Sequence, residues 1–128
     1  MQIDRYSHHS ANVTAILTEA LGHLREHRAG TRDPAALAHA LLFESGAWSV
    51  TWTDGRVPPL AHRSDGPALV SYEPEGALRL EWYDMGLLHR GGGLPALIEY
   101  NDDGEVSCEE WWEHAVPIGR RVSGDRQP

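Results

Sequence analysis

Two stretches of this 128-residue chain repeat each other. Residues 61–76 read AHRSDGPALVSYEPEG, and residues 88–104 read LHRGGGLPALIEYNDDG. Three tryptophans, Trp52, Trp82 and Trp112, follow one another at intervals of thirty residues. A unit of this length cannot bury its own apolar face, so neighbouring units must stack or pair to form a core. The repeat therefore predicts a regular structure built from degenerate units of 28–30 residues.

Apolar and polar residues alternate within the repeats, as they do in strands that bury one face. The alternating runs cover residues 48–52, 70–72, 78–82 and 98–100. Turns that contain glycine follow at 54–55, 74–76 and 102–104. Short connections join antiparallel neighbours, so the sequence predicts an antiparallel β-meander of five to six strands.

The first 46 residues follow the helical period instead. Ser10 is a suitable N-cap for a first helix, and Gly30 ends it. Its expected apolar stripe comprises Val13, Ile16, Leu17, Ala20, Leu21 and Leu24. Asp33 and Pro34 have the residue types of a second helix start. The stripe of this second helix comprises Leu37, Ala38, Leu41 and Leu42, and Gly46 ends it.

The length is that of one domain, large enough for a core without disulfides or metals. We expect an α+β fold over residues 1–128. Two N-terminal helices (1–46) pack on the repeat sheet (47–122), and a flexible tail (123–128) follows.

The pattern HRSDGPAL…Y…G…WY, within residues 47–115, resembles the MORN-type repeats found in bacterial and phage proteins. Those repeats are β-hairpin units with recurring glycine, tyrosine and tryptophan. The units of this chain are longer, and the usual glycine spacing of that family is not kept. The resemblance implies a sheet architecture and an interaction surface.

The chain carries a formal net charge of −8, which is unevenly distributed. Residues 47–128 hold fourteen acidic side chains against seven arginines. A protein that binds a phosphate backbone needs clustered cations, so a nucleic-acid partner is not expected. The acidic region fits a basic partner protein, a cationic ligand or a bound metal, or it serves solubility alone.

No apolar run approaches the ~20 residues of a membrane span, and the N-terminal residues do not resemble a secretory signal. The single cysteine, Cys108, cannot form an internal disulfide, which fits a reducing compartment. We therefore expect a cytoplasmic protein without a membrane partner, and the sequence indicates no cofactor.

Two His-Arg pairs, His62-Arg63 and His89-Arg90, are the first candidates for chemistry. Such a pair can bind an anion, because arginine offers two parallel donors and histidine titrates near neutrality. Since a catalytic site needs its residues once and a fold needs them in every unit, the repetition favours a structural role. If the protein is an enzyme, these four residues and Glu110 would form an acid–base site in a cleft between helices and sheet.

The segment HLREH, from His23 to His27, matches the H-x-x-E-H signature of some zinc proteases. Helical spacing lets the two histidines share a metal. However, a helical wheel places Glu26 on roughly the opposite side, and no further carboxylate helix follows. A solvated helix flank is the simpler interpretation, and no metal site is predicted.

Glu110 occupies a special place in the alternation. If the three strands that end in tryptophan are aligned, Cys108, Glu110 and Trp112 take the inward positions of the third strand. The inward carboxylate then either marks an edge strand or is a functional acid. Arg120 or Arg121 could be its partner.

The outward positions provide the leading functional hypothesis. They place acidic and aromatic residues on one sheet face, namely Glu81, Tyr83, Glu99, Glu109 and Trp111. Exposed aromatic side chains in an acidic setting suit a protein partner or a ligand. We therefore expect a small protein-binding module of the immunity, inhibitor or adaptor kind. The alternatives are the acid–base enzyme and a homodimer that buries its tryptophan-rich face.

Overall fold

The computed structural model describes residues 3–6, 8, 11–33 and 37–123. These residues form a short 3-10 helix, η1 (Ile3–Arg5), and one α-helix, α1 (Val13–Ala29). The strands are β1 (Ala38–Leu42), β2 (Trp48–Trp52), β3 (Leu69–Tyr72), β4 (Leu78–Glu81), β5 (Tyr83–Asp84), β6 (Leu87–Leu88), β7 (Leu97–Tyr100), β8 (Val106–Glu113) and β9 (Val116–Val122). Ser10 and Pro34, predicted at helix starts, lie outside the described residues, as does the predicted tail beyond Ser123.

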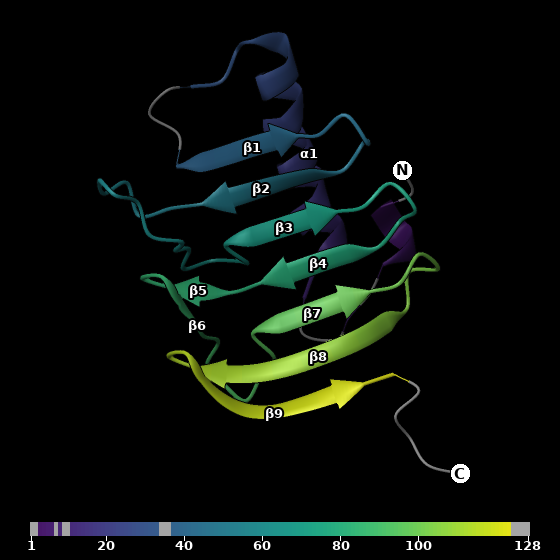
Figure 1. Cartoon of the computed structure of the whole chain (residues 1–128), viewed down its shortest axis with the longest axis vertical. Coiled ribbons are helices and arrows are strands. Elements are labelled where there is room, and N and C mark those ends of the chain that lie inside the picture. Colours follow the sequence, from purple (N-terminus) through teal and green to yellow (C-terminus); the bar gives the residue numbers. More distant parts are fainter. Residues whose placement is uncertain (1–2, 7, 9–10, 34–36, 124–128) are drawn as a thin grey trace.

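The strands form an open antiparallel sheet in the order β1-β2-β3-β4-β7-β8-β9, in which neighbours in space follow one another in the chain (Figure 1). The short strands β5 and β6 form a separate hairpin between β4 and β7. The α+β class and the antiparallel meander are therefore confirmed. The sheet is larger than predicted, with seven strands and a two-stranded hairpin in place of five to six strands.

Helix α1 forms over the segment with the first apolar stripe. Its N-cap is Asn12, whose side chain accepts the N–H of Ala15, so the helix begins two residues later than expected. Gly30 ends the helix in the left-handed conformation (φ 70°) that glycine adopts without strain. The fully buried part of the predicted stripe consists of Val13, Leu17, Ala20 and Leu24.

The predicted second helix is wrong, because Ala38–Leu42 is the edge strand β1. The segment fits a helical stripe, but it also alternates with period two. Ala38 and Ala40 are 4% and 8% exposed, whereas Leu41 and Leu42 remain exposed. Pairing with β2, in which Ala40 lies opposite Val50, outweighs the local helical pattern. The boundary predicted at residue 46 therefore moves back to the end of α1.

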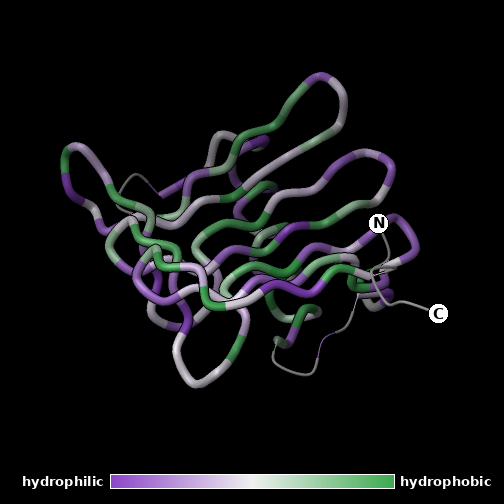
Figure 2. The backbone as a smooth tube through the Cα atoms, turned by 60° about the horizontal axis from the view of Figure 1, so that its bottom comes forward, coloured by the Kyte–Doolittle hydropathy of each residue, from purple (hydrophilic) through white to green (hydrophobic). Residues whose placement is uncertain are grey.

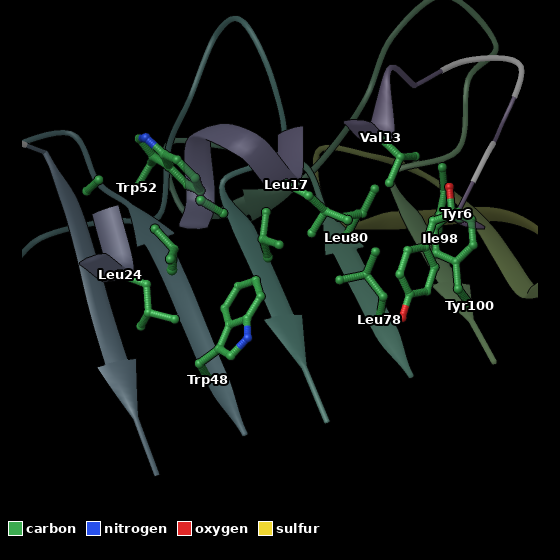
Figure 3. Close-up of a cluster of buried hydrophobic side chains, with 14 of the residues drawn as sticks. Tyr6, Val13, Leu17, Leu24, Trp48, Trp52, Leu78, Leu80, Ile98 and Tyr100 are labelled. Carbon is green, nitrogen blue, oxygen red and sulfur yellow. The ribbon is translucent and has the colours of Figure 1, made fainter. Parts of the chain in front are cut away.

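One face of the sheet packs on α1, and we call it the helix face (Figures 1 and 3). A central row of buried residues runs across five paired strands of this face: Ala40, Val50, Val70, Leu80 and Ile98. Leu17 of α1 is fully buried in the same cluster. Burying one such side chain contributes about 1.5–3 kcal/mol, so this layer is the main apolar core. We call the opposite side of the sheet the open face.

A β-bulge near the start of β8 changes the alternation of that strand. Tyr100 of β7 pairs with Val106, but the preceding residue Glu99 pairs with Cys108. Ser107 is therefore an extra residue without an opposite partner. One extra residue reverses which side chains point to each face.

Because of this bulge, the side chains of β8 after Ser107 point to the opposite faces of the sheet from those predicted. Glu109 lies opposite Ile98, so it belongs to the helix face. Cys108 and Glu110 lie on the open face instead of inward, and Trp112 joins them there, because its indole N–H donates to Glu110. In addition, β8 is an interior strand between β7 and β9 and not the edge strand considered from the sequence.

The N-terminal segment adds to the helix face at β7 and β8. Tyr6 packs edge-on against Tyr100, with ring centroids 5.5 Å apart, and its hydroxyl donates to the carbonyl of Gly76. The Nε2 atom of His8 lies 2.6 Å from a carboxylate oxygen of Glu109, and the two side chains are only 3% and 8% exposed. Residues about a hundred positions apart in the sequence are therefore in direct contact.

Candidate functional site

The arginines of the two His-Arg pairs make the same contacts in both repeats. Each guanidinium stacks on the tryptophan of its repeat and donates to a following proline carbonyl. The sets are Arg63 with Trp52 (4.1 Å) and Pro67, and Arg90 with Trp82 (4.0 Å) and Pro95. Stacking of this kind shields the guanidinium from water and contributes of order 1 kcal/mol.

The histidines also repeat their contacts. The Nδ1 atom of His62 accepts the N–H of Met85, and that of His89 accepts the N–H of His114, both at 3.1 Å. Met85 and His114 lie at hairpin tips and have φ values of 48° and 46°, which cost a non-glycine residue energy. Each histidine thus supports the tip of the adjacent hairpin, as the structural interpretation of the pairs requires.

Arg63 and Arg90 line one pocket of about 460 Å³ between the first turns of α1 and the loops that precede β3 and β7. A second pocket, of about 540 Å³, adjoins it on the side of β2. Arg63 stands between the two, where its guanidinium binds Glu19 at 2.5 Å and Asp65 at 2.9 Å. The hydrogen bond from Arg63, followed by its charge, lowers the pKa of Asp65. We call both pockets together the α1 groove.

The five residues of the alternative acid–base site do not converge. Arg63 and Arg90 share the α1 groove, and His62 lines its second pocket. His89, however, stacks on the ring of His114, with centroids 3.9 Å apart. Glu110 lies on the open face of the sheet. This arrangement does not provide the acid–base cleft described from the sequence.

The open face brings together three residues of the predicted binding surface, Glu81, Tyr83 and Glu99. The buried carboxylate of Glu81 accepts the hydroxyl of Tyr83 at 2.5 Å and binds Arg79. Burial, followed by the hydrogen bond to Glu81, raises the pKa of Tyr83 to about 12. Burial alone would lower the pKa of Arg79, but neighbouring carboxylates, Glu81 foremost, raise it. The positive charge of Arg79 therefore compensates the negative charges of the neighbouring carboxylates.

Glu110 belongs to the same face. Its carboxylate accepts the indole N–H of Trp112 at 2.9 Å, and Arg120 lies 3.4 Å away, as suggested from the sequence. Cys108 is buried beside it. With Glu81 and Glu99, the open face holds three glutamates and two arginines, so it is much less acidic than expected.

The other two residues of the predicted binding surface lie elsewhere. Glu109 is buried on the helix face against His8, and Arg121 approaches its second oxygen at 3.9 Å. The indole N–H of Trp111 donates to the carbonyl of Gly93. The expected face of five acidic and aromatic residues is therefore divided by the bulge in β8.

A further concentration of negative charge lies on three hairpin turns, which the pattern of the strands did not single out. The turns 43–47, 73–77 and 101–105 follow β1, β3 and β7, and the sheet register aligns them at one end. The turns themselves contain no basic residue, and Arg5 reaches this end only to donate to the carbonyl of Asp102. Figure 1 shows the three turns at one end of the sheet, and Figure 2 shows the hydrophilic residues on them. We call this surface the acidic end. It consists of six exposed carboxylates: Glu44, Glu73, Glu75, Asp102, Asp103 and Glu105.

The H-x-x-E-H segment lies on α1, but its histidines are not arranged as a pair. His23 packs edge-on against Trp52, at 5.7 Å between centroids, whereas His27 and Glu26 are exposed. His23 therefore lies nearer to the core than His27 does. Within the described ranges, no group of three or more metal-binding side chains could hold a metal ion.

Among the residues with assigned positions, no helix is both long and apolar enough to cross a membrane.

The hydroxyl of Tyr100 is buried and has no hydrogen-bond partner among the described residues. Burial and the nearby charge of Glu109 raise its pKa, and Arg90 opposes this shift. Removing an unsatisfied buried hydroxyl relieves a desolvation penalty, so Tyr100→Phe is expected to stabilise the protein by about 1 kcal/mol.

Tyr6→Phe is the matched control, because the same change in the same ring pair removes a hydroxyl that donates to Gly76. It is expected to destabilise the protein by about 1 kcal/mol. Urea denaturation measures both variants, and a loss of stability in Tyr100→Phe equal to that in Tyr6→Phe would contradict the assignment.

Comparison with protein-family models, with curated proteins and with solved structures found no match for this chain. The resemblance to MORN-type repeats therefore stays a prediction, and function must be argued from the geometry.

Proposed function

We propose that this chain is a small protein-binding module that docks a basic segment of a partner protein at its acidic end. The observation that carries the proposal is the alignment of three acidic turns by the sheet register. Among the ion pairs of the described residues, none involves the six carboxylates. Such a surface attracts cations over about 10 Å in moderate salt.

The rest of the molecule supports this choice of surface. The charges of the open face are paired with one another, so they offer a partner less than the turns do. Trp48, Trp52 and Trp82 are buried within the chain itself, which disfavours a subunit interface built on them.

The test compares two variants that lose the same charge. Glu73→Gln with Glu75→Gln removes two carboxylates from the acidic end, and Glu26→Gln with Glu113→Gln removes two exposed carboxylates elsewhere. Proteins retained from a lysate of the source organism on each immobilised variant are quantified by mass spectrometry. We expect a basic partner to be lost from the first variant and kept by the second.

Raising the ionic strength should release the same partner, because salt screens the attraction between solvent-exposed charges. Equal retention by the two variants, or retention that salt does not change, would reject the acidic end as the docking surface. Sedimentation of the purified protein tests the homodimer separately.

A further inference from the structure

The main sheet has two edge strands, β1 and β9, at opposite ends of its strand order (Figure 1). An edge strand leaves backbone groups unpaired on one side, and proteins usually protect such an edge with proline, a bulge or charged side chains. Strand β9 has all three, namely Pro117, a register shift in its pairing with β8, and the arginines Arg120 and Arg121. This edge is therefore poorly suited to pair with another strand.

Strand β1 has none of these protections. Its sequence, AHALL, contains no proline, arginine, lysine or acidic residue, and it pairs with β2 without a register shift. Large apolar side chains at this edge are between 41% and 57% exposed, namely Leu37, Leu41, Leu42 and Phe43. Strand β1 therefore offers apolar contacts beside an unprotected backbone edge.

The hydrogen bonds to β2 determine which backbone groups of β1 face outward. Successive residues of an antiparallel strand bond alternately to one side and to the other. Phe43 donates to the carbonyl of Ala47, so the odd-numbered residues of β1 bond toward β2. The residues whose N–H and C=O groups face away from the sheet are therefore Ala38, Ala40 and Leu42.

Part of this outward row is already bonded within the chain. Arg32 donates to the carbonyl of Ala38 at the start of β1. Among the described residues, the outward groups of Ala40 and Leu42 have no hydrogen-bond partner. A further strand can therefore pair with the end of β1 that leads into the turn 43–47, which belongs to the acidic end.

Charge favours a basic partner over a second copy of this chain. Two copies repel each other, because each carries a formal net charge of −8. A basic segment is attracted instead, and Glu44 lies in the turn directly after β1. Every neighbouring pair in the main sheet is antiparallel. A strand added antiparallel to β1 would have its N-terminal end at this turn.

We infer that β1 binds an extended segment of the partner as an additional antiparallel strand, in which basic residues precede alternating apolar residues. The inference rests on the proposed function, because the basic residues lie at the acidic end. Backbone hydrogen bonds to Ala40 and Leu42 hold the segment. Its alternating side chains contact Leu41 on the open face and Leu42 on the helix face.

The test uses three peptides of equal charge with blocked termini. Three lysines precede Thr-Val-Thr-Val-Thr in the first peptide and follow it in the second, and they precede Gly-Ser-Gly-Ser-Gly in the third. Affinities are measured by NMR titration of the ¹⁵N-labelled protein in low salt.

We expect the first peptide to bind at least about tenfold more tightly than the other two. The second peptide carries its lysines away from the acidic end when it pairs antiparallel to β1, and the third is rich in glycine, which is unfavourable in strands. The first peptide should also slow hydrogen exchange at the outward amides of Ala40 and Leu42.

Leu42→Pro removes one outward N–H without removing a hydrogen bond to β2, and proline is tolerated at such edge positions. It should weaken binding of the first peptide at least about tenfold. Leu42→Ala, which keeps the N–H, is the matched control and should change binding much less. The three peptides are compared on the unmodified protein, so they decide the inference even if Leu42→Pro does not fold.

Glu44→Gln with Glu73→Gln separates this inference from the proposed function. The double variant removes two carboxylates of the acidic end, so it should weaken both peptides that begin with lysines. If it does so, but the first peptide binds no better than the other two, only the pairing with β1 is rejected. If it leaves both peptides unchanged, the proposed function fails and the inference fails with it.

Two further results would overturn the inference. One is a folded Leu42→Pro variant that binds the first peptide as tightly as the unmodified protein does. The other is a free protein that sediments as a dimer and becomes a monomer in Leu42→Pro, because a second copy would then occupy the edge.

Discussion

Replacing Gly104 by alanine is expected to lower the free energy of unfolding by about 3 kcal/mol. Gly104 has a φ of 85°, a conformation that costs residues with a side chain energy. In addition, an added Cβ would overlap the backbone carbonyl of Arg5. Because that carbonyl belongs to the main chain, the N-terminal segment would have to move away from the turn before β8. Urea denaturation measures the loss.

Gly92→Ala separates the two causes. Gly92 has a similar φ of 73°, but nothing lies within 4 Å of the position of its Cβ. In this variant the free energy of unfolding should fall only by the cost of the backbone conformation, about 1 kcal/mol. If both alanine variants lose the same free energy of unfolding, the close approach of Gly104 to the N-terminal segment does not contribute to the loss.

His8→Ala is expected to cost about 3 kcal/mol, because among the described residues it leaves the buried carboxylate of Glu109 with only the more distant Arg121. Removing one partner of a buried pair is far more costly than removing both. The double variant His8→Ala with Glu109→Leu should therefore be more stable than His8→Ala alone. The free energies of unfolding of these variants give the comparison.

Glu110 on the same strand provides the control. Its partner Arg120 is 66% exposed, and an exposed ion pair contributes at most about 1 kcal/mol. Arg120→Ala should thus cost much less than His8→Ala. A double variant no more stable than His8→Ala would mean that the carboxylate of Glu109 is not the source of the loss.

The sequence predicts the parts of this fold in which local pattern and burial agree. The stripe of α1 is buried as its period requires, and Gly30 ends the helix. The alternation of Trp48, Val50 and Trp52 sets the helix face of β2. In these segments one side meets the core and the other meets solvent, which is the condition on which both periods depend.

Two predictions fail for lack of a local signal. The spacing of Leu37, Ala38, Leu41 and Leu42 fits both periods, and only the pairing with β2 selects the strand. The bulge at Ser107 involves neither glycine nor proline, so nothing in the sequence indicates that the parity of β8 reverses there. Comparison with earlier repeats then placed Glu109 and Glu110 on the wrong faces.

In the candidate site, too, the sequence predicts contacts that follow from a local pattern and misses arrangements that depend on the tertiary fold. Repetition of His62-Arg63 as His89-Arg90 indicates contacts that each unit must make, and both pairs do make equivalent contacts. Two turns of the acidic end, 73–77 and 101–105, are recognisable in the sequence as separate turns, whereas 43–47 is placed at the end of the predicted second helix. The alignment of the three turns depends on the register of the sheet, which composition does not specify.

The contact between His8 and Glu109 has a consequence for the order in which the chain can assemble. Every strand of the main sheet pairs with the next one in that sheet, so hairpins can be added one after another as the polypeptide leaves the ribosome. Tyr6 and His8 are made before Tyr100 and Glu109, the residues that they contact. The two earlier residues therefore have no partner until β7 and β8 have been synthesised, so their docking can only follow the synthesis of β8.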